Sequence, residues 1–584
     1  MDCCLKSVLR HCEKHRIGFV ICALVWMNVL FGQSANFGKP LNIPLELSGS
    51  FAELRSNHFH GGLDFKTQQK EGLPVYAVAD GRLSRVVVSG TGYGKALYIS
   101  HSGGMMSVYA HMSGFVPSID TIVNKQHYAK QSFELDFQLP NPIRFKKGDL
   151  IGYSGNTGSS GGPHLHFELR NKYGENALNP TFYGYAVKDD TPPIISTFAV
   201  YPKDHNSVVE NQQTPLLLPV KCRGKNCFVK DTIRVLGQMA FGIEAIDKAN
   251  GSANKLGLYA MKLFIDDELQ FAWKIDSVPF SQTRYINAFF DYAHYDSTGR
   301  RIQWTCQLPA NRLNIYEKVN TKGVYSFFEQ GTHDVRIEAS DAFGNTAVLN
   351  TVLMVDTNMV SVNNEDCVSD ELEHRRFFSH AIGNTFETDE IKIVIPQFAL
   401  YEPIYFDYSV EPSLDPRVYS NVHYVHHSGT PVHRNYSLKI KSVGLPGILG
   451  SKALIASWNA SKNEWVAEGG QYKDGFVWLN IRKFSIFAVC MDTINPTVKP
   501  IDVRNNTVLL SQNVLTFRIE DDFSGIGTYV ATLDGRWFLM TYDPKTRTLK
   551  GAIDTKLTKG EHDFKLTVSD KMNNSTTYTA KIIR

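Results

Sequence analysis

The chain has 584 residues, of which 43% are hydrophobic and 20% are charged. That length predicts several domains, and the apolar fraction excludes wholesale disorder. The 61 Lys and Arg against 58 Asp and Glu leave a formal net charge of only +3, so we expect no nucleic-acid partner, because such a partner usually requires a strongly basic surface. The 12% aromatic content, with 44 Gly and 24 Pro, favours an all-β, multidomain fold with many turns.

The first 32 residues have the pattern of a secretory signal peptide. Basic residues are spread over positions 1–16, an almost unbroken apolar run fills positions 17–31, and small or polar residues follow. A membrane-spanning helix needs about 20 apolar residues, so the shorter run favours a cleaved signal peptide over an anchor. We therefore expect export of the remaining chain without a permanent membrane anchor.

Residues 33–188 are expected to form one antiparallel β domain. Short β-type runs at 75–78, 82–89, 96–101, 105–111 and 150–153 are separated by glycine-rich turns. The segment FELDFQL, residues 133–139, alternates apolar and polar residues and predicts a half-buried strand. No helical periodicity of useful length is evident in this region.

Two later segments repeat one pattern. GTHDVRIEASDAFGN (331–345) aligns without gaps with GEHDFKLTVSDKMNN (560–574). Each copy combines strand alternation with an Asp/Asn-rich turn, and each lies near the end of a block that opens with Asp-Thr and a nearby Pro. The repeat predicts two immunoglobulin-like β-sandwich modules, at 189–356 and 491–584. A polar linker at 357–389 and a β-rich domain at 390–490 are expected between them.

The sequence assigns no ligand to these C-terminal modules. It shows neither an Asp-rich calcium loop nor an aromatic strip, so a spacer role and a binding role stay equally open. Cys222 and Cys227 could form a disulfide in an oxidising compartment or could remain separate buried thiols. Four histidines at 423, 426, 427 and 433 have no carboxylate at a useful spacing, and we expect them to be surface residues.

Three segments of the first domain carry the residue types of a metal site. They are NHFHGGLD (57–64), YAHM (109–112) and TGSSGGPHLHFELR (157–170). In an extended strand, residues two apart share a face, so His164 and His166 present two imidazoles together while Leu165 and Phe167 point to the core. Neutral imidazole is a good zinc ligand.

The spacing of His60 and Asp64 suits a shared metal ion only if the chain bends between them. A fully extended stretch of four residues would span about 13 Å, whereas two ligands of one zinc each lie about 2 Å from it. Gly61 and Gly62 permit that bend. With His166 the pair would make a three-ligand site with a fourth position open for water, the pattern of catalytic zinc sites.

His111 and His164 are then histidines in the same sheet that are not needed as ligands. Hydrolysis assisted by zinc requires a base for the water and positive charge for the oxyanion. These two histidines could supply both. His58 is a spare histidine that we expect to be exposed or near the site without binding metal.

Together these motifs resemble the lysostaphin/LytM-type zinc metallopeptidases. The resemblance covers roughly residues 40–185 and includes the flanking sequences GLPVYAVADG (72–81) and KGDLIGYSGNTG (147–158). It implies a small antiparallel β domain with an open groove, one Zn²⁺ per peptidase domain held by His60, Asp64 and His166, and catalysis by His111 and His164. The segment 113–145 is longer than the corresponding segment of most members, and we expect it to form a wall of the groove.

The usual activity of that family is cleavage of peptide cross-links in bacterial peptidoglycan. We therefore expect an exported zinc endopeptidase in the periplasm or cell envelope of a bacterium, with peptidoglycan peptides as substrate and possible cell-envelope protein partners of the C-terminal β domains. The alternative is a non-catalytic wall-binding protein that activates other hydrolases. Loss of ligands would mark that class, and none is lost here.

Overall fold

The computed structural model describes residues 37–250, 252–359, 376–509, 514–554 and 557–584. The signal peptide expected at residues 1–32 lies outside this range. The described chain is built from β-strands with two α-helices, α2 (Pro117–Lys130) and α3 (Tyr292–Thr298), so the expected all-β, multidomain fold is confirmed. No helix in these ranges is long and apolar enough to span a membrane.

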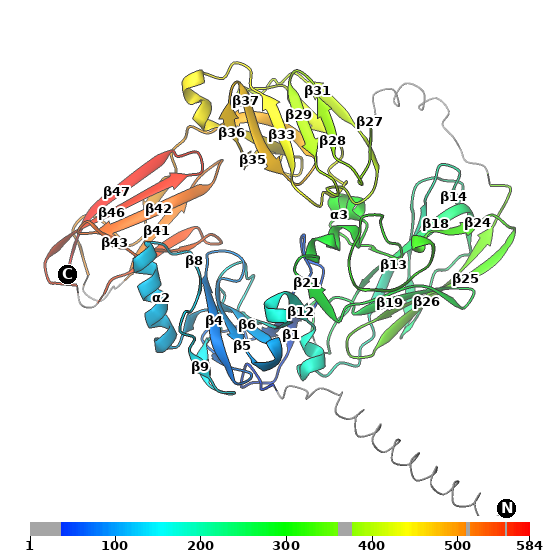
Figure 1. Ribbon diagram of the computed structural model, residues 1–584, viewed down its shortest axis with the longest axis horizontal. Helices are drawn as coiled ribbons and strands as arrows, with labels where there is room; N and C mark the ends of the chain where they lie inside the picture. The colour runs from blue at the N-terminus through cyan, green and yellow to red at the C-terminus, as the bar shows by residue number, and fades with distance from the viewer. Residues whose placement is uncertain (1–36, 251, 360–375, 510–513, 555–556) are drawn as a thin grey trace, which may run out of the picture.

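Four β-rich units follow one another around a ring (Figure 1). We call them the N-terminal domain (37–188), the first sandwich (189–359), the third unit (376–491) and the last module (492–584). The chain returns on itself, because the last module lies beside α2 of the N-terminal domain (Figure 1). There the ring of Tyr128 on α2 packs edge-on against Trp537, with ring centroids 5.2 Å apart.

The N-terminal domain is organised by one antiparallel sheet with β11 near its centre. Its strand order is β1-β2-β11-β6-β5-β4-β8, and a separate small sheet has the order β3-β10-β7. The strands are β1 (Leu47–Gly49), β2 (Leu63–Lys66), β3 (Pro74–Tyr76), β4 (Gly81–Val88), β5 (Lys95–Ser100), β6 (Met106–Met112), β7 (Gly114–Phe115), β8 (Leu135–Gln138), β9 (Arg144–Phe145), β10 (Leu150–Tyr153), β11 (His164–Asn171) and β12 (Asn176–Leu178).

Helix α2 is the element of this domain that the sequence analysis did not predict. It begins with Pro117 at its first turn and buries Ile119, Val123 and His127, which are spaced four residues apart. This narrow apolar stripe contains a histidine, so its amphipathic signal is weak. The segment 113–145 does contain the expected strand, as β8, but α2 packs towards Trp537 of the last module.

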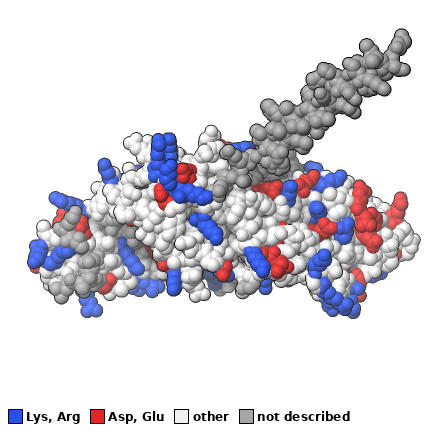
Figure 2. Space-filling model, turned by 90° about the horizontal axis from the view of Figure 1, so that it is seen from below, with Lys and Arg blue, Asp and Glu red and all other residues white. Residues whose placement is uncertain are grey.

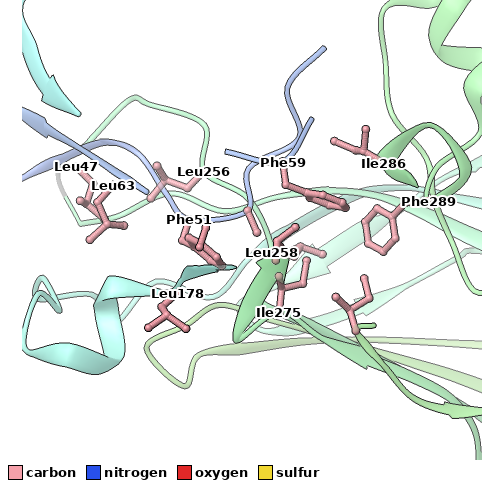
Figure 3. Close-up of a cluster of buried hydrophobic side chains, with 14 of the residues drawn as sticks. Leu47, Phe51, Phe59, Leu63, Leu178, Leu256, Leu258, Ile275, Ile286 and Phe289 are labelled. Carbon is pink, nitrogen blue, oxygen red and sulfur yellow. The ribbon is translucent and has the colours of Figure 1, made fainter. Parts of the chain in front are cut away.

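The first sandwich shares its hydrophobic core with the N-terminal domain. Figure 3 shows Phe51, Phe59 and Leu178 of the N-terminal domain packed among Leu258 and other apolar side chains of the sandwich. Backbone pairing continues across the junction, because β12 pairs with β21 (Ser277–Pro279). The two units therefore share one hydrophobic core and a continuous strand pairing, although their sequence patterns predict two separate domains.

The first sandwich contains one 13-stranded sheet whose main path has the order β15-β13-β18-β26-β25-β19-β20-β23. Its strands are β13 (Ile194–Pro202), β15 (Leu216–Pro219), β18 (Ile233–Ile246), β19 (Ala260–Ile265), β20 (Glu268–Lys274), β23 (Tyr316–Val319), β25 (Gly331–Ser340) and β26 (Thr346–Val355). Shorter strands join it: β14 (Val208–Val209), β16 (Lys221–Arg223), β17 (Asn226–Phe228), β22 (Gln303–Trp304) and β24 (Tyr325–Phe327). Cys222 and Cys227 are joined by a disulfide that links β16 to β17.

The third unit consists of two five-stranded sheets and one short strand pair. One sheet contains β28 (Asn384–Glu387), β29 (Ile391–Ile395), β33 (Tyr436–Lys441), β37 (Phe476–Ile481) and β36 (Gln471–Lys473). The other contains β31 (Tyr408–Glu411), β32 (Val422–Val425), β38 (Ser485–Met491), β34 (Ala453–Asn459) and β35 (Glu464–Gly469). The pair is β27 (Arg376–Phe378) with β30 (Ile404–Phe406). Thus β27 and β28 lie within the segment 357–389 that we expected as a linker.

The last module has two sheets around its own core. One contains β39 (Thr497–Pro500), β41 (Val514–Glu520), β45 (Thr548–Ala552) and β44 (Thr541–Asp543). The other contains β40 (Thr507–Val508), β47 (Ser575–Ile583), β46 (Glu561–Asp570), β42 (Ile526–Leu533) and β43 (Arg536–Phe538).

The sequence repeat corresponds to one structural device in the first sandwich and the last module. In each copy the repeated histidine contacts an Asp in a neighbouring turn: His333 Nδ1 lies 2.6 Å from Asp266 Oδ2, and His562 Nδ1 lies 2.7 Å from Asp534 Oδ2. The residue after each histidine donates its backbone N–H to the same Asp. The repeated His-Asp therefore fixes a strand to the neighbouring turn in both modules.

The surface carries charges of both signs. On the face in Figure 2, Lys and Arg are interspersed with Asp and Glu over the visible described residues. The balance matches the nearly neutral composition, and no large single-sign field forms on this face.

The shared core makes a testable prediction about joint stability. Phe289 of the first sandwich is 1% exposed, and its ring centroid lies 5.6 Å from that of Phe59 in the N-terminal domain. We expect Phe289→Ala to lower the free energy of unfolding by about 3–5 kcal/mol, measured by denaturant titration, and calorimetry to show both units unfolding in one transition. The control Phe328→Ala, at a side chain that is 54% exposed, should change little. A separate, unshifted transition of the N-terminal domain would contradict the shared core.

Candidate metal centre

The register of strand β11 brings the predicted ligands together. Pairing with β2 sets His166 opposite Asp64, and pairing with β6 sets His166 opposite Ala110. Because side chains alternate along a strand, His164 and His166 share one face. Segments about 100 residues apart in sequence thereby converge on that face.

Three donor atoms form a compact triangle. His60 Nε2 lies 3.0 Å from Asp64 Oδ1 and 3.0 Å from His166 Nδ1, and the latter two atoms are 2.9 Å apart. All three side chains are buried. Zinc lies about 2.0–2.2 Å from nitrogen and carboxylate ligands, so these three atoms are close enough together to bind one ion. The donor set, two imidazoles and a carboxylate, suits zinc.

Hydrogen bonds at the atoms that face away from the triangle orient the predicted ligands His60 and Asp64. His60 Nδ1 lies 2.7 Å from the carbonyl oxygen of Ser50, so its N–H is directed there and Nε2 is left free for a cation. Arg55 Nη2 donates to Asp64 Oδ2 over 3.2 Å, which leaves Oδ1 facing the two histidines. Burial by itself would raise the pKa of Asp64, but His60 and the hydrogen bonds with the surrounding histidines hold it well below its usual range.

A buried ionic network lies behind His166. Its Nε2 lies 2.7 Å from Glu168 Oε1, and Glu168 also accepts hydrogen bonds from Arg170 and from the Tyr93 hydroxyl. Burial alone would lower the pKa of His166, but the bonds to Asp64 and Glu168 raise it to about 9. Burial likewise opposes ionisation of Glu168, yet Arg170 and His166 lower its pKa. The network therefore directs Nδ1 of His166 toward Asp64.

His111 reaches the same face through a β-bulge. Lys95 pairs with Met112 and Leu97 with Tyr109, so Ala110 and His111 share one partner position on β5. In a regular strand His111 would point with Tyr109 into the core. Its φ of +59° turns it instead toward His164, with ring centroids 4.8 Å apart. Bulges re-aim side chains in this way beside active sites.

His111 and His164 each direct Nδ1 to a backbone carbonyl oxygen. His111 Nδ1 lies 2.8 Å from the Thr157 carbonyl oxygen and His164 Nδ1 lies 2.8 Å from that of Gly162. His164 Nε2 is 3.4 Å from Asp64 Oδ1. Burial, followed by the nearby His166 and His164, lowers the pKa of His111 to about 3. This shift favours the neutral form of the His111 imidazole.

Asp64 and His164 are among the residues that line an open groove of about 730 Å³. That volume lies within the range of about 300–1,000 Å³ typical of ligand sites. Its walls come from the segments around β1 and β2, from the glycine-rich turn before β11, and from Asn254 of the first sandwich. Segment 113–145 contributes none of the residues that line it, so the expected wall is formed by other parts of the chain.

The last module supports the glycine-rich turn from the other side. Lys545 Nζ donates hydrogen bonds to the carbonyl oxygens of Asn156 and Ser160. Ser160 Oγ in turn lies 3.2 Å from His164 Nδ1. A residue nearly 400 positions along the chain thus lies two contacts from a predicted catalytic histidine.

Comparison with known proteins agrees with this geometry. Residues 58–130 match Peptidase family M23. The chain carries an M23 peptidase domain. The resemblance expected from the sequence is thereby confirmed. Residues 375–492 match a second family, the Zu5-like domain.

The curated relatives match short stretches of this chain. The DD-carboxypeptidase/endopeptidase Mpg of Neisseria meningitidis is 33% identical over 117 residues, which are 20% of this chain and 21% of Mpg. An uncharacterized metalloprotease of Haemophilus influenzae is 33% identical over 121 residues, 21% of this chain and 20% of that protein. The chain thus spans about a fifth of the length of these relatives. The catalytic domain of lysostaphin from Staphylococcus simulans is 22% identical, with a TM-score of 0.18 and coverage of 23% of this chain and 87% of that one.

The remaining histidines lie apart from the M23 centre. His58 is exposed, and its Nδ1 lies 2.9 Å from the Ser56 carbonyl oxygen. Among the described residues, the histidines at 423–433 belong to no group of side chains that could bind one metal ion together. The expectation that they are surface residues is wrong for His423, which is buried and contacts the Tyr408 hydroxyl. A strand position facing the core, rather than the polar composition around it, determines its burial.

Sequence reasoning missed the residues that orient the donors. Tyr93, Glu168 and Arg170 form the network behind His166, and Arg55 contacts Asp64. Glu168 and Arg170 follow His166 at spacings of two along β11. The alternation of that strand could therefore have predicted that both side chains share the face of His166. The sequence assigned no role to Tyr93, which lies in a segment that supports the family resemblance, and gave no indication of Arg55.

This network predicts an effect on metal affinity. Glu168→Gln removes the charge that orients His166, so we expect the affinity for Zn²⁺ to fall about 10–100-fold, measured by competition with a chromophoric chelator. Glu175→Gln makes the same chemical change at an exposed position and should leave affinity unchanged. Circular dichroism would verify that both variants are folded, and equal affinities in folded Glu168→Gln and wild type would contradict this role.

Proposed function

We propose that this protein is an exported zinc-dependent endopeptidase that hydrolyses amide bonds in peptidoglycan peptide cross-links. The observation that carries the proposal is the triangle of His60, Asp64 and His166 donors with His111 and His164 beside it. The match to Peptidase family M23 supports the reaction class, and the name of the relative Mpg, a DD-carboxypeptidase/endopeptidase, supports the substrate class.

His60, Asp64 and His166 would hold the ion. When bound, Zn²⁺ supplies a Lewis acid for the scissile carbonyl and lowers the pKa of water toward about 7. The hydrogen bonds of Ser50, Arg55 and Glu168 hold the three donors in place without reorganisation.

His111 and His164 would assist the attack of water on the carbonyl group. Each directs Nδ1 to a backbone carbonyl and leaves Nε2 as the atom that faces the reacting groups. His111 would orient the attacking water by accepting its hydrogen bond at Nε2, and the proton that the water loses would leave with the amine product. His164, which lines the groove, is placed to stabilise charge on the carbonyl oxygen.

The groove is suited to an extended peptide. It is lined by polar groups and glycine as well as by Pro44 and Ile43. Backbone groups of a peptide can pair with such a lining while small side chains pass the glycines. The complete donor set disfavours the alternative of a non-catalytic activator, because that role would not require three ligands to converge.

Variants should separate metal binding from catalysis. Asp64→Ala or His166→Ala should abolish both bound zinc, measured by atomic emission, and hydrolysis. His164→Ala should lower hydrolysis by about 10²–10⁴-fold while most of the zinc remains. The exposed His58→Ala serves as the matched control and should keep full activity. Loss of zinc in His164→Ala would show that our division of roles along β11 is wrong.

Digestion of purified peptidoglycan tests the substrate. We expect the wild-type chain to release peptide fragments, identified by mass spectrometry, with the reaction stopped by a chelator and restored by Zn²⁺. The His166→Ala chain is the control for contaminating hydrolases. Unchanged muropeptides across several wall types, with the zinc site occupied, would overturn the peptidoglycan proposal and favour the activator.

A further inference from the structure

A second group of possible metal ligands lies where the chain enters the first sandwich. Asp189 precedes β13, Asp247 follows β18, and Asp341 follows β25. One carboxylate oxygen of each lies within 4.8 Å of the others. The three come from separate segments, which is why the sequence shows no local calcium loop.

Among the residues that the structure describes, these carboxylates have no cationic partner. Asp247 is 2% exposed, and its Oδ1 is buried without a hydrogen-bond partner, as is Oδ2 of Asp189. Among the ion pairs of the described residues, none includes these carboxylates. A buried carboxylate is costly unless it is paired or coordinates a metal.

The orientation of Asp341 is fixed independently of any ion. Its Oδ1 accepts the backbone N–H groups of Phe343 and Asn345, and its Oδ2 accepts the Asn345 side-chain amide. That amide also reaches the Asp189 carbonyl oxygen over 3.2 Å. Asn345 thereby joins two of the three segments and keeps their carboxylates close together.

The chemistry of the donors selects a hard cation. All three are carboxylates, and no histidine or cysteine belongs to the group. Calcium takes six to eight oxygen ligands from carboxylates, backbone carbonyls and water in a flexible geometry, whereas zinc favours nitrogen and sulfur. We propose that Asp189, Asp247 and Asp341 form a Ca²⁺ site, distinct from the zinc centre of the M23 domain.

The last module repeats this arrangement. Asp492, Asp521 and Asp570 bring their carboxylates equally close, and Oδ1 of Asp521 is also buried without a hydrogen-bond partner. Asn574 bonds Asp570 and the Asp492 carbonyl oxygen as Asn345 bonds Asp341 and Asp189. The Asp and Asn of the sequence repeat therefore belong to one device that is present twice.

The position of the first site gives it a structural role. Asp247 borders a small enclosed cavity whose other walls include Ser50 and Phe51 of the N-terminal domain and Phe343 of the sandwich. Ser50 is also the residue whose carbonyl oxygen orients His60. An ion here would hold the entry of the sandwich against the segment that supports the zinc centre.

Calcium titration of the full-length chain tests the proposal. The protein is stripped of metal and reloaded with one equivalent of Zn²⁺, and CaCl₂ is then added in a calorimeter. We expect wild type to bind Ca²⁺ with a Kd at or below about 1 mM, and Asp247→Asn to bind one ion fewer per chain. The exposed neighbour Asp190→Asn is the matched control and should bind as wild type does.

A second variant and a stability measurement guard against misfolding. Asp189→Asn, at a partly exposed residue, should also lose one Ca²⁺ per chain. Without calcium, Asp247→Asn should melt at or above the wild-type temperature, because a buried unpaired charge is removed. No Ca²⁺ binding by wild type up to 10 mM, or an unchanged number of bound ions in both folded variants, would overturn the site.

Discussion

The pairing of β11 between β2 and β6 is the constraint on which the functional centre depends. Its register sets His166 opposite Asp64 on one side and opposite Ala110 on the other. A shift by one residue would turn both histidines of β11 into the core and Leu165 and Phe167 out of it. Burial of these apolar neighbours therefore fixes the register, and the register assembles the donors.

Support for the donors extends outward in layers. Carbonyl oxygens and the Glu168–Arg170 network hold the imidazoles. The first sandwich then holds the N-terminal domain through a common hydrophobic core and a continuous backbone pairing (Figure 3). The last module reaches back to the turn before β11 through Lys545. The first sandwich and the last module are thus part of the scaffold of the M23 domain.

Some of this architecture follows from local patterns. The β-type runs and the alternation in residues 133–139 predicted strands that the structure contains, since alternation reports one buried face. The helix α2 was missed because its buried stripe is narrow and includes a histidine. The bulge at His111 was equally out of reach, because it arises from a mismatch between two paired strands and neither strand reveals it alone.

The sequence by itself determined which chemical groups are available: the His and Asp donors, the glycines that let the chain bend, and the acidic turn that occurs twice. Tertiary structure alone decided where those groups point and what surrounds them. Arg55 and Tyr93 support the centre from separate segments, and Asp189, Asp247 and Asp341 meet only after three segments fold together. The reason is physical: side-chain identity is a local property, whereas proximity and burial depend on pairing between distant parts of the chain.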